Sequence, residues 1–311
     1  MNISSSVSVI ITCYNQGRFL GEAIESALRQ TRPPHEIIVV DDGSTDDTAA
    51  IASRYRRVKL VQQRNSGLAA ARNAGIHAST GDYLVFLDAD DRLVPCALDT
   101  GINRLRAHRD CAFAYGRYSL ITDDGKVIPS TQRTPAQGPP YLRLLISNYI
   151  GMHATVMYRR EIFASVGEFD TSLAACEDYE MFLRITRHNP IYFHGETVAE
   201  YRQHQANMSR SSGLMLHYSL SVLGSQRKYV RGNRQAVEAY RAGIRNWRDC
   251  YGKKLFTTVG SQIRKHQWGP AIKGMRILLR YLPGSVANKL GRALIRTTAR
   301  APRHFAIKMS R

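Results

Sequence analysis

Cysteine is scarce in this chain of 311 residues: there are five, at positions 13, 96, 111, 176 and 250, and no two form a Cys-x-x-Cys pair. An odd and scattered set argues against a disulfide framework or a zinc site and fits a reducing cytoplasm. Long apolar runs are also lacking, because none approaches the roughly 18–20 residues that cross a bilayer. The N-terminus has no basic region followed by an apolar stretch and a cleavage site. We therefore expect a cytoplasmic protein whose contact with a membrane is peripheral.

Acidic residues are nearly absent from the last third of the chain. Residues 1–211 contain 23 Lys+Arg and 23 Asp+Glu, whereas residues 212–311 contain 21 and 2. The formal net charge of +19 therefore arises in the second segment. A protein that binds nucleic acid needs basic residues on its binding face, so the neutral first segment argues against nucleic acid as the principal partner. We expect two units, residues 1–211 and a basic α-helical extension over residues 212–311.

Short β-branched runs alternate with helical patterns over the first ninety residues. Strands are predicted at Val7–Thr12, Glu36–Asp41, Val58–Gln62 and Tyr83–Leu87, and helices at Phe19–Gln30, Asp47–Tyr55 and Gly67–Ala78. This order predicts an α/β fold with a largely parallel sheet, which binds ligands beyond the carboxyl ends of its strands. Thr12, Asp42 and the run from Asp88 to Asp91 should meet there. The segment from Thr122 to Pro140 is predicted to be a loop.

Glycine motifs that bind phosphate are missing. Neither a P-loop nor a GxGxxG motif follows any predicted strand, which argues against NTP hydrolysis and dinucleotide binding. Carboxylates are present instead: Asp88 and Asp90 lie two residues apart after a strand, where alternate side chains point the same way. Oxygen ligands suit Mg²⁺ or Mn²⁺, which would in turn bridge a diphosphate.

Three further residues of this part are candidates for nucleotide binding. Asp42 could accept the N–H of a nucleobase while Tyr14 supplies a ring to stack on the base. The alternative for Asp42 is a helix cap. Arg72 could reach the ribose or the phosphates, or be a solvated helix arginine.

A second group of candidates lies farther along the chain. Asp178 falls at the N-terminus of a helix predicted over Asp178–His188, where the positive end of the helix dipole would keep it ionised, as a general base must be. Plain helix capping is the alternative. His204 follows a strand-like run and is a candidate third metal ligand, although a lone histidine is more often structural. His153 is interpreted as a packed core histidine.

Five motifs occur in the order and approximate spacing of the family 2 glycosyltransferases, and the chain resembles that family over about residues 5–210. They are Val9-Ile-Ile-Thr-Cys-Tyr-Asn15, Val39-Val-Asp-Asp-Gly-Ser-Thr-Asp46, Gly67-Leu-Ala-Ala-Ala-Arg-Asn-Ala-Gly75, Phe86-Leu-Asp-Ala-Asp-Asp91 and Glu177-Asp178. The resemblance implies a GT-A fold with a nucleotide-binding mixed sheet flanked by helices. It also implies a nucleotide-diphosphate sugar donor, a divalent metal (Mn²⁺ or Mg²⁺) and inversion at the anomeric carbon.

The resemblance also assigns roles to single residues. Thr12, Tyr14 and Asp42 would hold the base and Asp88 the ribose side. Asp90 would contact the metal, and Asp178 would deprotonate an acceptor hydroxyl.

The QxxRW motif and the membrane spans of processive family members are absent, which favours a single-transfer enzyme. The resemblance is to bacterial enzymes of cell-surface polysaccharide or glycolipid synthesis, with a glycan or lipid-linked acceptor. Three alternatives stay open. One is a polyprenyl-phosphate sugar synthase, whose phosphate acceptor needs no base. Another is a non-catalytic nucleotide-sugar domain with a tail that binds nucleic acid. The third is a nucleotidyltransferase, but such enzymes usually have a Gly-rich basic loop after the first strand, and Cys13-Tyr-Asn-Gln-Gly17 is not one.

The basic extension is predicted to rest on an anionic membrane surface, at the inner face of the membrane. A helical wheel over residues 271–282 places on one side Ile272, Met275, Leu278, Leu279 and Leu282, and on another Lys273, Arg276 and Arg280. A second amphipathic segment is predicted from Val286 to Arg296. Packing of these apolar stripes on the catalytic domain is the alternative. The shortage of acid favours lipid, since each basic residue near an anionic surface gains roughly 1 kcal/mol.

Overall fold

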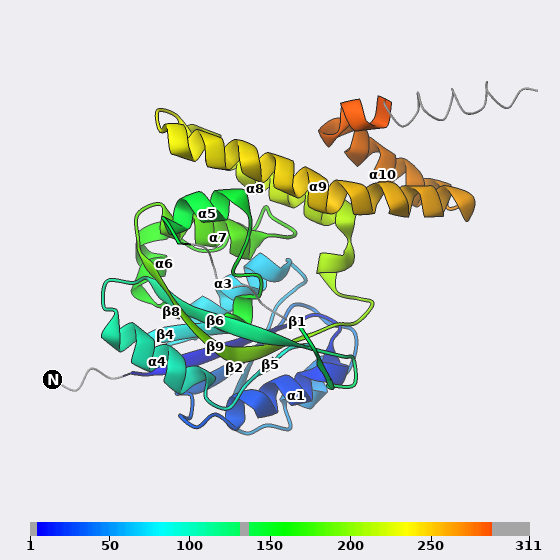
Figure 1. Cartoon of the computed structure of the whole chain (residues 1–311). Coiled ribbons are helices and arrows are strands. Elements are labelled where there is room, and N and C mark those ends of the chain that lie inside the picture. Colours follow the sequence, from blue (N-terminus) through cyan, green and yellow to red (C-terminus); the bar gives the residue numbers. More distant parts are fainter. Residues whose placement is uncertain (1–4, 131–136, 288–311) are drawn as a thin grey trace, which may run out of the picture.

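The computed structural model describes residues 5–130 and 137–287. Within these ranges nine strands form one sheet in the order β3-β2-β1-β4-β8-β6-β9-β5, with β7 paired to β6 (Figure 1). The strands are β1 (Val7–Cys13), β2 (Glu36–Asp41), β3 (Val58–Gln62), β4 (Tyr83–Asp88), β5 (Arg92–Leu93), β6 (Phe113–Ile121), β7 (Val127–Ile128), β8 (Val156–Arg159) and β9 (Ile191–Arg202). The first four strands of the order are parallel, and β8 runs antiparallel to both of its neighbours. The predicted mixed sheet flanked by helices is confirmed.

Helices cover both faces of this sheet. In chain order they are α1 (Gly17–Leu28), α2 (Thr48–Ala52), α3 (Leu68–Ala78), α4 (Ala97–Ala107), α5 (Pro140–Ile146), α6 (Glu161–Val166), α7 (Glu177–Thr186), α8 (Ser212–Val230), α9 (Arg234–Arg264) and α10 (Trp268–Tyr281). Figure 1 shows α1 and α4 on one side of the sheet and α3, α5 and α7 on the other. No helix of the described residues is long and apolar enough to cross a membrane.

The central strands are buried on both sides, which is why they read as continuous apolar runs. Alternate side chains point to opposite faces. Ile10 and Phe86 pack in the core beneath α3, α5 and α7, whereas Ile11 and Val85 pack in the core beneath α1 and α4. The burial of both faces fixes the strand register, and with it the position of the residues at the strand ends.

One segment predicted as a loop contains a short hairpin. β7 pairs with the end of β6 inside the Thr122–Pro140 segment. The reversal is made at Gly125, which has a φ of +82° and donates its N–H to the Thr122 carbonyl. A strand of two residues is too short to produce an alternating pattern, so the sequence did not reveal it.

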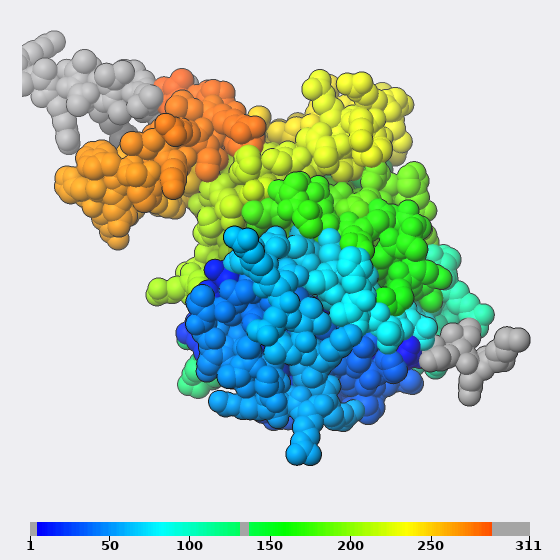
Figure 2. Space-filling model, turned by 180° about the vertical axis from the view of Figure 1, so that it is seen from behind, coloured from blue at the N-terminus to red at the C-terminus, as the bar shows by residue number. Residues whose placement is uncertain are grey.

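The basic extension begins with two helices that lie against α5 and α7 (Figures 1 and 2). Leu216 and Leu223 of α8 and Trp247 of α9 belong to the same buried core as α7. At Gly243 of α9 an added Cβ would lie 1.9 Å from the carbonyl oxygen of Leu145 in α5. The backbones of α9 and α5 are therefore in close contact at Gly243.

The predicted amphipathic helix of the extension forms, but its apolar side is divided. α10 starts at Trp268, and its Leu278 is fully buried, whereas Ile272 and Leu279 are 52% and 51% exposed. The expectation of a single exposed apolar side over residues 271–282 was therefore wrong. Leu278 lies on the side of α10 that packs on α9, a partner that the wheel did not include. Of the second amphipathic segment, Val286 is buried and residues 288–296 lie outside the described residues.

Candidate active site

The carboxyl ends of three parallel strands bring the first group of predicted residues to one edge of the sheet. Thr12 of β1 lies in register with Asp88 of β4, and Cys13 with Asp41 of β2. The backbone N–H of Asp42 donates to the Cys13 carbonyl at 2.9 Å. The predicted meeting of Thr12, Asp42 and Asp88 at these strand ends is therefore confirmed.

Asp88 is the centre of a chain of polar contacts. Its Oδ1 accepts from the Thr12 hydroxyl at 3.2 Å and from Nη2 of Arg72 at 3.0 Å. The other terminal nitrogen of Arg72 donates to Glu177, at the first residue of α7. A residue of α3 thus joins the end of β4 to the start of the helix that carries Asp178.

Arg72 is almost completely buried, which excludes the alternative of a solvated helix arginine. Burial alone would lower its pKa, but the carboxylates of Asp88 and Glu177 outweigh burial and raise that pKa. Glu177 is itself buried. A buried ion pair holds its members in fixed positions because either charge left without its partner would be strongly destabilising.

Asp42 is buried and its carboxylate is engaged on the loop that leads into α3. It accepts from the Gln63 side chain at 2.7 Å and from the backbone N–H groups of Ser66 and Gly67, both at 2.9 Å. The ring of Tyr14 is 49% exposed near the end of the neighbouring strand. A base stacked on this ring would lie at the edge of the sheet where Asp42 is fixed.

Asp90 and His204 form the second polar group of the site. Nε2 of His204 lies 2.8 Å from Oδ2 of Asp90, and its Nδ1 accepts from the N–H of Ala206 at 3.2 Å. With Nδ1 engaged by the main chain, Nε2 is the ring nitrogen that faces Asp90. Burial and the charge of Asp88 raise the pKa of Asp90, and the contact with His204 opposes that rise.

The turn that carries Asp88 and Asp90 is held by Asp91, the last residue of the predicted run, and by Arg202, which the sequence did not single out. Asp91 is buried and accepts from the N–H of Arg202 at 2.9 Å. The buried Arg202 guanidinium donates to the Asp90 carbonyl at 2.9 Å and to Glu22 of α1. In the sequence, the only sign of this interaction was that Arg202 is a basic residue two positions before the candidate ligand His204.

Two of these side chains fit a divalent cation. Neighbouring ligands of a cation with bonds of about 2.1 Å are separated by about 3 Å, close to the 2.8 Å between Asp90 Oδ2 and His204 Nε2. Within residues 5–130 and 137–287 no group of three or more His, Cys, Asp or Glu side chains forms a complete metal site. A cation here would take its remaining ligands from a diphosphate and from water, as Mg²⁺ commonly does.

Asp178 is partly buried at the start of α7, and its Oδ1 lies 2.6 Å from the N–H of Tyr179. Burial and the neighbouring charge of Glu177 raise the pKa of Asp178 to about 7. Burial and Glu177 therefore oppose the ionisation that the helix dipole favours. A pKa near neutrality still suits a group that must take up a proton during turnover.

His153 is buried in an aromatic cluster, which confirms its interpretation as a core residue. Its ring stacks on Phe86 at 5.1 Å, and Nε2 lies 2.9 Å from the Tyr158 hydroxyl. Burial holds the pKa of His153 well below its usual value.

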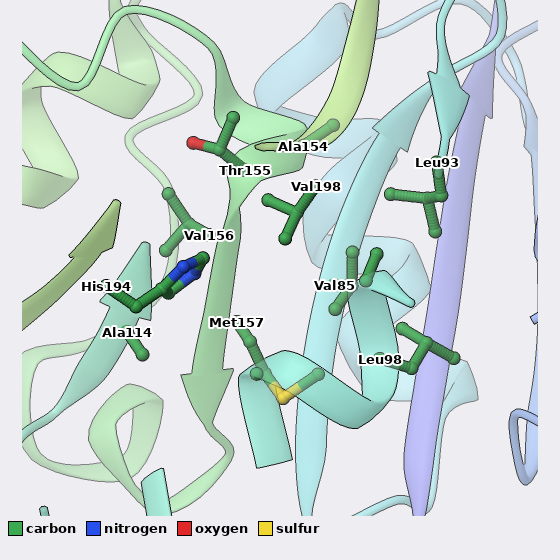
Figure 3. Close-up of a pocket in the computed structure, with 12 residues that line it drawn as sticks. Val85, Leu93, Leu98, Ala114, Ala154, Thr155, Val156, Met157, His194 and Val198 are labelled. Atoms are coloured by element: carbon green, nitrogen blue, oxygen red, sulfur yellow. The ribbon is translucent and has the colours of Figure 1, made fainter. Parts of the chain in front are cut away.

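A small cavity on the other face of the sheet is separate from these residues (Figure 3). It lies between α4 and the sheet and is lined mainly by apolar side chains such as Leu98, Met157 and Val198. His194 is its main polar residue, and burial lowers the pKa of that imidazole to about 4. The cavity has a volume of about 10 Å³, room for one water molecule and no substrate.

Comparisons with known proteins agree with this geometry. The model described as Glycosyl transferase family 2 matches residues 8–167. An uncharacterised glycosyltransferase of Rickettsia prowazekii is 32% identical over 216 residues, which cover 67% of this chain and 67% of that protein. A putative teichuronic acid biosynthesis glycosyltransferase of Bacillus subtilis is 32% identical over 203 residues, 63% of this chain and 78% of the relative.

The chain is also similar to part of a longer enzyme and to a solved structure. Chondroitin synthase of Escherichia coli is 29% identical over 188 residues, which cover 59% of this chain and 27% of that enzyme. Among solved structures, S. aureus TarS 1–349 in complex with UDP-GlcNAc has a TM-score of 0.65 at 17% identity, covering 90% of this chain and 82% of that one. The two proteins therefore share a fold.

Proposed function

Because the chain belongs to glycosyl transferase family 2, we propose that it moves a sugar from a nucleotide-diphosphate sugar to an acceptor hydroxyl with inversion at the anomeric carbon. The observation that carries the proposal is the link from Asp88 through Arg72 to Glu177. It ties the strand end where the donor would bind to the helix turn that bears a carboxylate of raised pKa. This link would fix the site of the sugar donor relative to the site of the acceptor hydroxyl, as group transfer requires.

On the donor side, the exposed Tyr14 ring would stack on the base, with Asp42 and Thr12 beside it and Asp88 on the ribose. Asp90 and His204 would hold a Mn²⁺ or Mg²⁺ ion. When bound, such an ion supplies electrostatic stabilisation of the diphosphate leaving group. Arg72 acts indirectly in this scheme, since both of its ends are engaged with protein carboxylates.

On the acceptor side, Asp178 would take the proton of the attacking hydroxyl. An alcohol is a poor nucleophile at neutral pH, and general bases contribute about 10²–10⁴-fold to such steps. Glu177, adjacent to Asp178, is engaged in an ion pair with Arg72. Asp178 is therefore the carboxylate of this turn that would take up the proton gained in the reaction.

The donor site can be tested by thermal stabilisation with a panel of nucleotide-diphosphate sugars, with and without Mn²⁺. UDP-GlcNAc is the first member, because a structurally similar protein binds it. We expect one donor to raise Tm in a manner that depends on the metal, since ligands that bind only the native state stabilise it. Asp90→Ala should remove the metal dependence, and Asp110→Ala, at an exposed turn, should not. Undiminished metal-dependent stabilisation of the Asp90 variant would refute this assignment.

The base can be tested separately. Asp178→Asn should leave donor binding intact and lower turnover by about 10²–10⁴-fold. Near-normal turnover would instead favour a polyprenyl-phosphate acceptor, whose phosphate oxygen needs no base.

We also propose that residues 212–311 act as a unit that holds residues 1–211 at an anionic membrane, on its inner face, where a lipid-linked acceptor would be found. The support is a surface stripe of α10, formed by Trp268, Ile272, Met275 and Leu279. Three of these side chains, all except the half-buried Met275, are more than half exposed, at 56%, 52% and 51%. On a wheel of about 100° per residue the exposed Lys273, Arg276 and Arg280 flank this stripe on the side away from α9. An apolar stripe beside a basic one is typical of a helix that lies in a lipid interface.

Sedimentation with vesicles of rising anionic lipid content tests this proposal. Removing residues 212–311 would expose the core that α8 and α9 complete, so point variants are required. Replacing Lys273, Arg276 and Arg280 by glutamine should weaken binding by about 3 kcal/mol, or about a hundredfold, at about 1 kcal/mol each. Val127→Ser, at an exposed apolar residue of β7, is the matched control. Equal sedimentation of the charge variant and the control would exclude the proposal.

A further inference from the structure

The first turn of α7 is held by contacts from three other helices. Cys176, immediately before it, has a φ of +64°, in the left-handed region that non-glycine residues seldom adopt. Such a conformation costs on the order of 1–3 kcal/mol and persists only where its surroundings enforce it. The next two residues are Glu177 and Asp178.

Two of the three helices belong to the basic extension. Sγ of Cys176 lies 3.5 Å from the hydroxyl of Ser219 in α8. Nε1 of Trp247 in α9 donates to the hydroxyl of Tyr179 at 3.4 Å, and the two rings meet edge to face at 5.6 Å. The residues before and after the Glu177-Asp178 pair are therefore both contacted from the extension.

The third helix completes the arrangement. The Tyr179 hydroxyl donates to the Leu144 carbonyl of α5 at 2.7 Å, so it is both donor and acceptor. Tyr179 and Ser219 are almost completely buried. A buried hydroxyl left without a partner costs about 1–3 kcal/mol, which makes this position of the turn strongly preferred. Trp247 is kept in place by Tyr251, whose ring stacks on it at 5.7 Å with an interplanar angle of 6°.

We infer that Trp247 is a positioning residue, through which the extension fixes Asp178 in the geometry of a general base. The inference rests on the proposed function only in the role of Asp178. Misplacement of a catalytic group by about 1 Å can lower a rate about 10²-fold. Loss of the Trp247 contact should therefore lower kcat by displacing Asp178. The extension is then a part of the active site and not only a means of attachment.

The first experiment needs no substrate. Hydrogen–deuterium exchange of the amides in residues 177–182 should accelerate about tenfold or more in Trp247→Leu, while the amides of β1 and β2 keep their rates. Tyr229→Leu is the matched control, because Tyr229 also lies on the extension and stacks under Arg187, at the other end of α7. Unchanged exchange in residues 177–182, or equal acceleration throughout the sheet, would overturn the inference.

The second experiment measures release of UDP from UDP-GlcNAc, with water as acceptor. Trp247→Leu should lower kcat about 10- to 100-fold with little change in the KM for UDP-GlcNAc. In a double-mutant cycle, Trp247→Leu should have no further effect once Asp178→Asn is present. Full additivity would mean that Trp247 acts elsewhere, which contradicts the inference. Absence of an Asp178→Asn effect together with accelerated exchange in Trp247→Leu would instead count against the proposed function alone.

Discussion

Asp178→Asn should make the protein more stable, and more so at pH 8 than at pH 5. Burial and the charge of Glu177 raise the pKa of Asp178 from 3.8 to about 7. The native state therefore binds this proton more tightly than the unfolded chain does. The resulting stability is fully present below about pH 3.8 and is lost as the pH rises through about 7. Asparagine does not titrate, so the variant does not suffer this loss.

The size of the effect follows from the difference in pKa. One unit is worth about 1.4 kcal/mol. At pH 8 the whole difference of about three units applies, an upper limit of about 4 kcal/mol, whereas at pH 5 only the interval above 3.8 counts, about 2 kcal/mol. The advantage of the variant in free energy of unfolding should therefore grow by about 2–3 kcal/mol between these two pH values.

Urea unfolding of both proteins at a series of pH values measures this difference. Asp249→Asn, at an exposed carboxylate of α9, should show no comparable trend. A difference that stays constant or shrinks from pH 5 to pH 8 would refute the reasoning. The expected gain in stability accompanies the expected loss of turnover, as is usual where an active site holds a group in an unfavourable environment.

Three further predictions follow from particular contacts. Glu177→Gln should lower the free energy of unfolding by about 1–3 kcal/mol, measured by urea unfolding, because Arg72 then keeps only one of its two carboxylates. Gly243→Ala should be destabilising and Gly224→Ala slightly stabilising in thermal unfolding, since an added Cβ meets a backbone oxygen at the first position and nothing within 4 Å at the second. Mn²⁺ affinity, measured by calorimetry, should fall as the pH falls, because the raised pKa of Asp90 lets a proton compete with the metal for this carboxylate.

The parts of the fold that could be predicted from sequence are the strands whose local hydrophobic pattern matches their position in the sheet. Strands β2 and β3 were predicted with the bounds that the structure gives. β2 is buried and reads as an unbroken apolar run, whereas β3 lies at the edge of the sheet and exposes Lys59 and Gln62. The same topology places the residues after β1, β2 and β4 at one edge, so the meeting of Thr12, Asp42 and Asp88 also followed from sequence. Tyr14 directly follows β1, so its place beside these residues could also be predicted from sequence.

The remaining part of the site depends on contacts between residues far apart in the chain. Arg72 and Glu177 are separated by 105 positions, and nothing in either local pattern indicates the partner. The raised pKa of Asp178 could not be predicted from sequence for a related reason. Its sequence position reveals a helix N-terminus, whereas the burial that raises its pKa comes from elements that the local sequence does not identify.

The extension shows how far a charge pattern can be interpreted without a structure. On its own, the near absence of acid over residues 212–311 favours a lipid surface over packing on the catalytic domain. Yet α8 and α9 pack on α5 and α7 although Glu238 and Asp249 are their only acidic residues, so a shortage of acid is compatible with packing. The distinguishing feature is instead the division of α10, whose Leu278 is buried while Trp268 and Leu279 are exposed. A helix that needed only to pack on α9 would have no use for a second apolar stripe, and exposed apolar side chains that form a contiguous patch mark an interaction surface. The membrane proposal therefore depends on this stripe together with its basic flank.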